Sequence, residues 1–555
     1  MNIPLPPILL LLAAPLSAQT VGGGFDHLVD VAGNSTNTGF GAGVSGAGDV
    51  NADGFDDFAV SQRLGLNPGV VRIFSGVNGD LLHEFIAPNL THRFGWSMSD
   101  TGDVNLDGFD DLIVGESDAD SGSLLYAGKA YLYSGQDGSI LYEWSGRNQG
   151  DSLGRLVSGA GDLNQDGHPD LLVSTNDTTA GNAGNGLVLA YSGSDGSLLF
   201  EFERPNIFGQ FGKSISDAGD VNHDGFPDVV VGSDTIDFGG QRKNGHVALL
   251  SGLDGTIIHE WHGTEAEAFL GCSVDGLGDI NQDGHSDILV GAWGAYNGGR
   301  RPGKAYAISG ADGSVIHEWV GIKGWKSFGW SVSNAGDIDL DGVNDAIIGD
   351  YLGALPSAFF IYSGADGSLI HTQTGSETYY DEFAAMVADA GDTNGDGRPD
   401  IVVSSYLSSD FGFSNGGAAH VIGYSPFMNA SGSEISISAG GRIDFEFDFP
   451  AEVAHHDYKV LASTSGNGPT FIGVDVPLTY DAVMQKAWDG SYFGTVEGRW
   501  HGTLNERAQG SAVIQVQPGV RPYLIGVSLQ VAVVAVHPNG PALYSSTAVP
   551  LTFLP

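Results

Sequence analysis

The sequence predicts an all-β chain: a seven-bladed β-propeller followed by a smaller, β-sandwich-like domain. Two observations predict the propeller. An acidic motif of ten residues occurs seven times in the 555 residues, with copies 54 to 59 residues apart. Each repeat also holds four short runs rich in Val, Ile, Leu and aromatic residues, separated by turn residues and too short for helices. Four-stranded units at this period are typical of propeller blades.

Each repeat has the same internal order. A short segment such as FGWSMSDTG, from Phe94, precedes the acidic motif, and an apolar run such as DILVGA, from Asp287, follows it. A third run leads into an SGxDG turn, and a fourth run follows that turn. The acidic motif reads GDVNADGFDD, GDVNLDGFDD, GDLNQDGHPD, GDVNHDGFPD, GDINQDGHSD, GDIDLDGVND and GDTNGDGRPD in the seven repeats.

The seventh repeat is incomplete at its C-terminal end. No SGxDG turn and no fourth run follow Ser425. The segment from Phe25 instead resembles the fourth-run tract that starts at Leu81. We therefore expect a strand near residues 27–32 to complete the last blade and to close a propeller of residues 19–425, since an open ring would leave unpaired strand edges.

The acidic motifs predict cation sites. Asp at position 1, Asn or Asp at position 3, and Asp at positions 5 and 9 supply hard oxygen ligands, and Gly at position 6 permits a sharp bend, which suits Ca²⁺. One copy could be an Asx turn without metal, but seven copies in register favour up to seven Ca²⁺ ions. The predicted ligands are Asp49, Asn51, Asp53, Asp57; Asp103, Asn105, Asp107, Asp111; Asp162, Asn164, Asp166, Asp170; Asp220, Asn222, Asp224, Asp228; Asp279, Asn281, Asp283, Asp287; Asp337, Asp339, Asp341, Asp345; and Asp392, Asn394, Asp396, Asp400.

The amino-acid composition and the apolar N-terminus indicate which classes of partner and which cellular location to expect. Asp and Glu number 67 against 22 Lys and Arg, a net charge of -45 that argues against nucleic acid or an anionic membrane as partner. The single cysteine, Cys272, excludes an internal disulfide. An apolar N-terminus ending in small residues predicts a signal peptide at residues 1–18, and no other apolar run is long enough to span a membrane. We therefore expect a secreted, extracellular or cell-surface protein.

The FG pairs ahead of the acidic motifs carry a family resemblance. They occur as Phe40-Gly41, Phe94-Gly95, Phe211-Gly212 and Phe328-Gly329. Together with the GDxNxDGxxD loops they resemble the FG-GAP repeats of integrin α-subunit propellers and of related bacterial secreted proteins, across residues 25–425. The step between the second and third motifs leaves no room for an inserted ligand-binding domain, so the resemblance is to an integrin propeller and not to a whole subunit.

The face opposite the acidic motifs is the expected ligand face, because its loops differ most between repeats. A basic and aromatic patch there would suit an acidic extracellular protein or polysaccharide; the alternative is that these bases only hydrate the loops. The ligand-face residues are Arg242, Lys243, Arg300, Arg301, Lys304 and Trp325.

These features favour a calcium-binding adhesion or ligand-binding module. Two alternatives stay open: a hydrolase or polysaccharide lyase on a calcium-stabilised propeller, because related propellers accompany such enzymes, and a structural surface-layer component. No nucleophile–base motif is visible, which favours binding over catalysis. Alternating apolar runs after Pro426 predict a β-sandwich over residues 426–555.

Overall fold

The computed structural model describes residues 23–33, 38–63, 69–87, 93–176, 186–203, 211–321, 327–351, 357–375, 382–409 and 415–426, and shorter stretches from 428 to 554. These later stretches are 428–430, 434–436, 441–448, 455–463, 470–471, 475–476, 497–499, 501–505, 509–516, 528–536, 542–545 and 549–554. The described residues form strands, turns and loops without a helix. The predicted signal peptide lies outside them. The chain divides into two compact units, one of residues 27–423 and one of residues 1–26 with 424–555.

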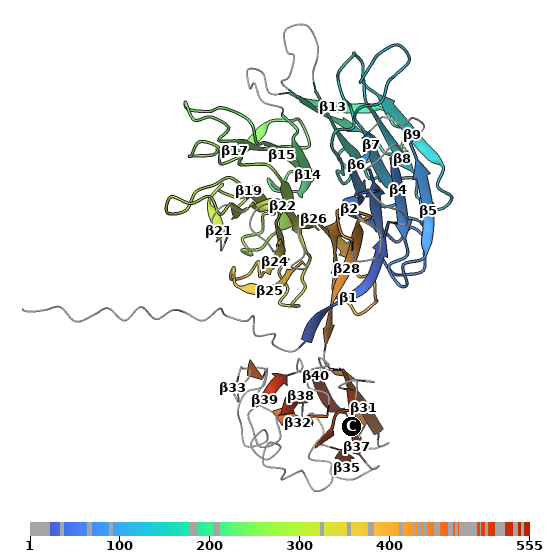
Figure 1. Cartoon of the computed structure of the whole chain (residues 1–555), viewed down its shortest axis with the longest axis vertical. Coiled ribbons are helices and arrows are strands. Elements are labelled where there is room, and N and C mark those ends of the chain that lie inside the picture. Colours follow the sequence, from blue (N-terminus) through green and yellow to red (C-terminus); the bar gives the residue numbers. More distant parts are fainter. Residues whose placement is uncertain are drawn as a thin grey trace, which may run out of the picture. The chain divides into compact units, whose positions relative to one another are not determined.

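The first unit is a seven-bladed propeller of four-stranded antiparallel sheets, as predicted (Figure 1). Blade one contains β2 (Phe40–Gly48), β3 (Asp57–Gln62), β4 (Val70–Phe74) and β5 (Leu81–Ile86). Blade two contains β6 (Phe94–Asp100), β7 (Leu112–Glu116), β8 (Lys129–Tyr133) and β9 (Ile140–Ser145). Blade three contains β10 (Val157–Gly159), β11 (Leu171–Thr175), β12 (Leu187–Tyr191) and β13 (Leu198–Glu203).

The remaining blades repeat this order. Blade four contains β14 (Ser214–Gly219), β15 (Asp228–Ser233), β16 (His246–Leu250) and β17 (Ile257–His262). Blade five contains β18 (Val274–Gly278), β19 (Asp287–Ala292), β20 (Lys304–Ile308) and β21 (Val315–Val320). Blade six contains β22 (Phe328–Asn334), β23 (Ala346–Asp350), β24 (Ala358–Tyr362) and β25 (Leu369–Thr374). Blade seven contains β26 (Phe383–Gly391), β27 (Asp400–Ser405), β28 (Ala418–Pro426) and β1 (Gly23–Ala32).

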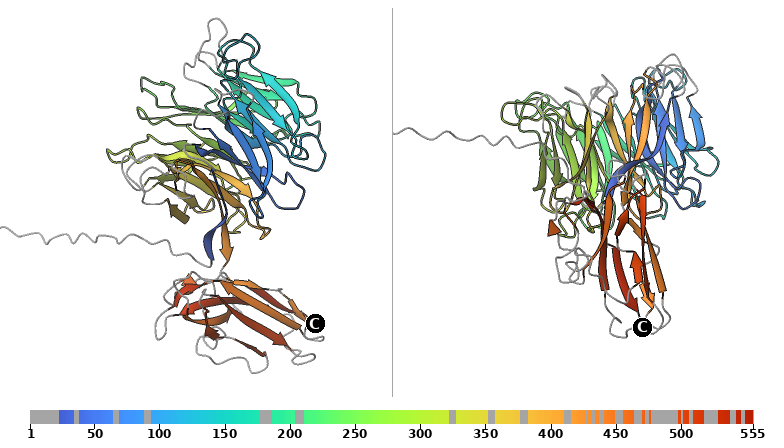
Figure 2. Two further views of the ribbon diagram at one scale, coloured as in Figure 1. Left: turned by 45° about the vertical axis from the view of Figure 1, so that its right-hand side comes forward. Right: turned by 60° about the horizontal axis from the view of Figure 1, so that its bottom comes forward.

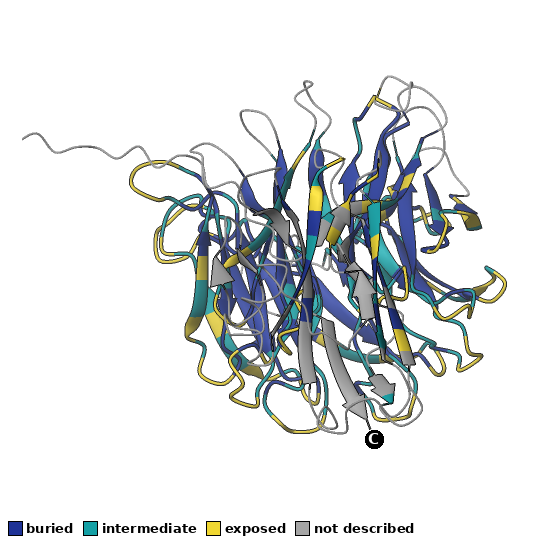
Figure 3. Ribbon diagram, turned by 90° about the horizontal axis from the view of Figure 1, so that it is seen from below, coloured by how far each residue is buried: buried dark blue, intermediate teal, exposed yellow. Residues whose placement is uncertain are grey.

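Burial explains the strand order within a blade. Second strands such as β7 and β15 are buried along their whole length, which suits their continuous apolar runs. Fourth strands such as β5 and β21 are largely exposed or half-buried and lie at the rim (Figure 3). The apolar clusters form between neighbouring blades, since one cluster joins Leu132 and Trp144 of blade two to Leu171 of blade three. Blade three, for example, buries one face against blade two and the other against blade four. The blades are therefore separate sheets arranged around a ring (Figure 2).

The ring closes through β1, which lies beside β28 as the outer strand of blade seven. Val29 and Val31 are buried in an apolar cluster with Val421 of β28 and Phe58 of blade one. Beyond the strand, the backbone amide of Gly33 donates to the carbonyl of Gly417 at 3.0 Å. The last blade thus joins the first and the last strand of the propeller sequence, and we call this junction the seam. The apolar cluster extends from the seam into blade one.

The antiparallel order fixes which loops share a face. The acidic loops join first to second strands and the SGxDG turns join third to fourth strands, so both lie on one face. The loops between second and third strands lie on the opposite face. First strands of neighbouring blades contact one another around the axis. Each first strand begins at its FG-type pair or within four residues after it, and it leads into the acidic loop at its other end. The two faces therefore receive different residues from the same strands.

The second unit also consists of strands. One sheet has the order β29 (Met428–Ala430), β31 (Gly441–Asp448), β37 (Gln509–Val516), β35 (Glu497–Arg499). A second has the order β30 (Glu434–Ser436), β40 (Val549–Leu554), β38 (Ser528–Val536), β32 (Asp457–Ser463), β36 (His501–Thr503), with β39 (Ala542–Ser545) on β38. The pair β33 (Thr470–Phe471) and β34 (Asp475–Val476) is separate. The β-sandwich assignment of this region stays a prediction.

Candidate metal loops and ligand face

All four predicted ligand residues of every acidic loop lie together in one turn. In the fifth loop, Asp279 accepts hydrogen bonds from the backbone amides of Asp283, at 3.0 Å, and Gly284, at 2.8 Å. The side-chain oxygen of Asn281 also accepts from the Asp283 amide, at 2.8 Å. The other six loops repeat these three contacts at positions 1, 3, 5 and 6. The chain therefore builds one loop seven times.

Two residues in each loop have left-handed backbone conformations. Glycine at position 6 has φ between 82° and 95° in the seven loops. Position 4 is also left-handed, and in six loops it is not glycine: it is Ala52, Leu106, Gln165, His223, Gln282 and Leu340, with φ of 55° to 61°. Such a conformation costs roughly 1 kcal/mol or more for a side chain without a local polar partner. Since this left-handed conformation recurs in six loops, the other contacts of the loop must compensate for its energetic cost.

The aspartate at position 9 lies beneath the loop and is completely buried in every blade. In blade five, Asp287 accepts from the backbone amide of Ile280 at 3.0 Å and from that of Gly310, in the SGxDG turn, at 3.1 Å. It therefore ties the acidic loop to the turn beside it. Burial raises the pKa of these carboxyls, to about 6 for Asp287 and to about 8 for Asp345, where Asp339 adds repulsion.

The donor set of the loops fits a hard divalent cation. The oxygens at positions 1, 3 and 5 accept backbone hydrogen bonds, but each carboxylate oxygen has a second lone pair that can face an ion. In the sixth loop, Asp337, Asp339 and Asp341 offer oxygens that lie within 4.8 Å of one another. Oxygen-only ligands with a Gly bend suit Ca²⁺ better than the nitrogen- and sulfur-preferring transition metals.

Neighbouring loops are bonded to each other. Asp110 of blade two accepts from the backbone amide of Asp49 in blade one at 2.8 Å, and Asp56 of blade one accepts from that of Asp392 in blade seven at 2.7 Å. The ring of His168 contacts the carbonyl oxygen of Val104 across the same kind of boundary, at 2.7 Å. Occupancy of one loop should therefore affect the next.

Blade seven compensates for its missing SGxDG turn. Position 2 of its loop is Thr393, where the other loops have an aliphatic residue. The Thr393 hydroxyl donates to Asp400 at 2.6 Å, and the backbone amide of Thr393 donates to the same oxygen at 3.0 Å. A side-chain donor thus supports the buried carboxylate where the turn is absent.

At the acidic-loop face, the axis is lined by carboxylates. A cavity of about 640 Å³ is bordered by Asp100, Asp217, Asp275 and Asp389, from four different first strands. Burial and neighbouring carboxylates raise the pKa of Asp100 and of Asp389 to about 6. Blade six has Asn334 at the corresponding place, where its side-chain oxygen accepts from the Gly336 amide at 2.9 Å.

Replacement of Asp100 or Asp389 by Asn is expected to stabilise the propeller at pH 8 by about 1 kcal/mol and to have little effect at pH 4. A carboxyl with a raised pKa contributes its stability at low pH and loses it as the pH rises through about 6, whereas Asn keeps the backbone bond without the charge. Thermal unfolding from pH 4 to pH 8 measures the difference. Asp312→Asn, at an exposed turn carboxyl whose pKa is lowered, is the control. If the Asp389→Asn protein unfolds at a lower temperature than wild type at pH 8, the result would contradict the expectation.

At the opposite face, the axis is cationic and aromatic. A cavity of about 380 Å³ is lined there by Trp96, Arg155, Lys213, Cys272 and Trp330, each the residue after its FG-type pair, in blades two to six. Arg93, Ser117 and Asp234 also border it. Ala42 and Ala385 hold the same position in blades one and seven. We name this cavity the axial pocket.

Four basic side chains lie at or beside the axial pocket: Arg63, Arg93, Arg155 and Lys213. The Arg63 guanidinium stacks on Trp96 at 3.6 Å, and its Nη1 is buried without a hydrogen-bond partner in the described part of the chain. Burial and the charge of Arg93 lower the pKa of Arg63 to about 10. In the described part of the chain, two of these bases form ion pairs: Asp118 lies 3.3 Å from Arg93, and Asp234 lies 3.8 Å from Lys213. An anion would supply the missing partner.

Two bases of the predicted basic patch form ion pairs with glutamates. Arg301 pairs with Glu267, and Lys304 pairs across the blade with Glu318 at 2.8 Å. Lys243 lies 5.8 Å over the Phe269 ring, while Arg242 and Arg300 are exposed. Trp325 lies outside the described residues. Glu267, which pairs with Arg301, comes from the connection between blades four and five, so that connection contributes negative charge to the patch.

Comparison with known proteins agrees with the repeat structure. A model of the FG-GAP-like repeat matches residues 162–231, and a model of the FG-GAP repeat matches residues 385–422. The propeller contains FG-GAP repeats, and the matched segments lie in blades three and four and in blade seven. Integrin alpha-5 of Xenopus laevis is 31% identical over 222 residues, which are 36% of this chain and 20% of the relative. Integrin alpha-V of Gallus gallus is 26% identical over 215 residues, with the same two shares.

These relatives confirm the resemblance of the FG-GAP propeller to integrin α subunits. A phosphatidylinositol-glycan-specific phospholipase D of Dictyostelium discoideum is also 29% identical over 180 residues, 26% of this chain and 19% of the relative. The chain spans about a fifth of the length of the curated relatives it matches. Within the described residues, no helix of a length and apolarity suited to crossing a membrane is found.

Proposed function

We propose that this protein is a secreted, calcium-stabilised FG-GAP propeller that binds an acidic extracellular ligand, a protein or a polysaccharide, on the face opposite its acidic loops. Residues 1–18 direct secretion and are removed. Up to seven Ca²⁺ ions, held by positions 1, 3, 5 and 9 of the loops, reduce repulsion among their carboxylates. The rigid ring then presents the ligand face. A role in cell adhesion follows from this arrangement.

The observation that carries the ligand proposal is the axial pocket. Four bases and two Trp side chains gather there in a chain of net charge -45, and among the described residues two of these bases form ion pairs with carboxylates. Arg guanidinium groups bind carboxylates through paired hydrogen bonds, and Trp faces suit the apolar side of a sugar ring or a side chain. The peripheral patch of Arg242, Lys243, Arg300, Arg301, Lys304 and Trp325 would extend the contact of a long ligand.

Binding of the full chain to hyaluronate and to poly-glutamate, measured in millimolar Ca²⁺, tests this proposal. These probes carry carboxylates on a sugar chain and on a peptide chain. We expect at least one to bind, and Arg155→Gln with Lys213→Met to weaken that binding about tenfold or more, because charge-assisted hydrogen bonds are lost. The double substitution of Arg300→Glu with Arg301→Glu tests whether the peripheral patch contributes to the same binding.

The matched control is Arg147→Gln, at a surface arginine that pairs with Glu201 at 2.6 Å outside the axial pocket. It should leave binding unchanged. Failure of both probes to bind, or binding that neither pair of substitutions weakens, would overturn the proposed ligand face. If only the Arg300 and Arg301 substitutions weaken binding, the ligand binds at the peripheral patch and not at the axial pocket.

The proposal includes the C-terminal region. Residues 426–555 would form a β-sandwich, and residues 19–425 the propeller domain. Support comes from contacts between the two larger sheets of that unit: the rings of Phe447 and Tyr458 lie 4.7 Å apart, and the Tyr458 hydroxyl donates to the carbonyl of Ser511 at 2.7 Å. Both contacts join β31 or β37 of one sheet to β32 of the other, as facing layers would.

A further inference from the structure

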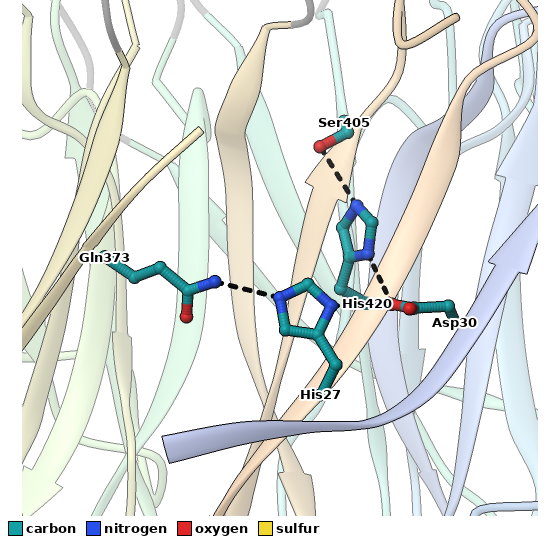
Figure 4. Close-up of polar contacts among 5 residues, drawn as sticks. All are labelled: His27, Asp30, Gln373, Ser405 and His420. Atoms are coloured by element: carbon teal, nitrogen blue, oxygen red, sulfur yellow. Dashed lines mark hydrogen bonds and ion pairs between the residues drawn. The ribbon is translucent and has the colours of Figure 1, made fainter. Parts of the chain in front are cut away.

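Three potential metal ligands meet at the seam of the ring. His27 and Asp30 lie on β1, and His420 lies on β28, 390 residues away from Asp30 (Figure 4). One Asp30 oxygen is 2.8 Å from Nδ1 of His27 and 2.6 Å from Nδ1 of His420. The three ligand atoms lie within 4.8 Å of one another. They therefore belong to one site that exists only when the N-terminal strand is docked.

Each histidine is also held at its other nitrogen. Nε2 of His420 lies 3.2 Å from the hydroxyl oxygen of Ser405, and Nε2 of His27 lies 2.8 Å from the amide nitrogen of Gln373 (Figure 4). Hydrogen-bond partners of this kind orient histidines that bind metals through their remaining nitrogen. Both Nδ1 atoms face Asp30, so both rings present the same atom to the shared site.

Gln373 has an unused acceptor. Its Oε1 is buried and has no hydrogen-bond partner among the residues that the structure describes. Rotation of the carboxamide by 180° would bring Oε1 to Nε2 of His27, where it would accept the Nε2 hydrogen. That tautomer leaves the Nδ1 lone pair of His27 toward Asp30, as a metal requires. The rotation would give Oε1 a hydrogen-bond donor, place the amide nitrogen at the former Oε1 position, and leave the Nδ1 lone pair of His27 for a metal.

The same residues are not arranged for catalysis. Ser405, His420 and Asp30 follow the order of a catalytic triad, but the Ser405 side chain is only 2% exposed and belongs to the second strand of the blade. A substrate carbonyl could not reach its hydroxyl. The accessible part of the cluster is the Asp30 and His27 side, where the side chains are 36% and 35% exposed. Water and ions can therefore reach the ligands and not the serine.

We propose that His27, Asp30 and His420 bind a transition-metal ion of the zinc class, which fastens the N-terminal strand to the last blade. Two imidazole nitrogens and one carboxylate oxygen form a donor set that suits Zn²⁺, with water at the fourth position. This set differs from the all-oxygen set of the acidic loops, so the two kinds of site select different ions. The proposal does not depend on the ligand-binding function.

Cobalt substitution tests the site in the full chain. With the acidic loops saturated by excess Ca²⁺, one equivalent of Co²⁺ is expected to give the visible absorption of a four-coordinate ion, and Zn²⁺ should displace it. Zn²⁺ should also raise the melting temperature by about 3 to 6 °C, since it binds only the closed ring. His27→Gln and Asp30→Asn should each weaken Zn²⁺ binding at least about 100-fold.

The control is His317→Gln, on the outer strand of blade five, where the ring forms a hydrogen bond with the carbonyl of Gly364 at 2.8 Å. Its Co²⁺ spectrum should equal that of wild type. Calcium-dependent melting of each variant verifies folding. Absence of a Co²⁺ spectrum in wild type, or a spectrum that His27→Gln leaves unchanged, would overturn the proposal; the latter would direct attention to the second cluster, of His246, Glu260 and His262.

Discussion

Chelation of calcium is expected to lower the melting temperature of the FG-GAP propeller by about 10 °C or more. Each occupied loop would stabilise the folded chain by about 2.7 kcal/mol at a Ca²⁺ concentration one hundred times the dissociation constant. Removal of the ions leaves carboxylates close together in seven loops, and the bonds between neighbouring loops spread the effect around the ring. Calorimetry in Ca²⁺ and in EGTA measures the change.

Substitutions in a single acidic loop test whether calcium acts through these loops. Asp283→Ala removes a carboxylate at position 5 and should reduce the calcium-dependent part of the melting temperature. Asp312→Asn changes an exposed aspartate in the neighbouring SGxDG turn, whose side chain bonds the Ser314 amide at 2.9 Å, and should leave the calcium dependence intact. An equal melting temperature of the wild-type protein in Ca²⁺ and in EGTA would refute calcium stabilisation.

Val31→Asp is expected to destabilise the propeller by about 4 kcal/mol, because it places an unpaired carboxylate in the apolar cluster at the seam. The cluster joins β1, blade seven and blade one, so the substitution acts on closure of the ring as well as on one strand. Urea unfolding, followed by tryptophan fluorescence, should show a lower midpoint.

The matched change is Ile86→Asp, in the outer strand of blade one, where the side chain is 57% exposed. This substitution should alter the midpoint little. If the two variants unfold at the same urea concentration, closure through β1 does not contribute to stability as the structure implies.

The loops and the blade order could be read from the sequence, because the contacts that build them are local. Position 1 bonds positions 5 and 6 of the same loop, so the spacing of Asp49, Asp53 and Gly54 already specifies the turn. The four strands of a blade alternate with turns in sequence order. Similarity of the Phe25 segment to the fourth-run tracts pointed to the strand that the structure places in blade seven.

The axial pocket was missed, although a signal for it exists. Residues that follow the FG-type pairs read Ala42, Trp96, Arg155, Lys213, Cys272, Trp330 and Ala385 around the ring. This position varies while its neighbours repeat, as a ligand-contacting position on a fixed scaffold would. The basic patch stays a prediction; the structure adds that Arg301 of this patch pairs with Glu267, from the connection between blades four and five.

The amino-acid sequence by itself determined the number of blades, the strand order and the seven acidic loops, since each depends on residues within one repeat. Only the tertiary structure decided what meets at the axis and at the seam. Arg155 and Lys213 come together with Trp330 because neighbouring first strands surround a common axis, and His27 reaches His420 because the ring closes. The axial residues recur once in each repeat, but which of them face one another, and whether His27 reaches His420, depends on the number of blades and on closure of the ring.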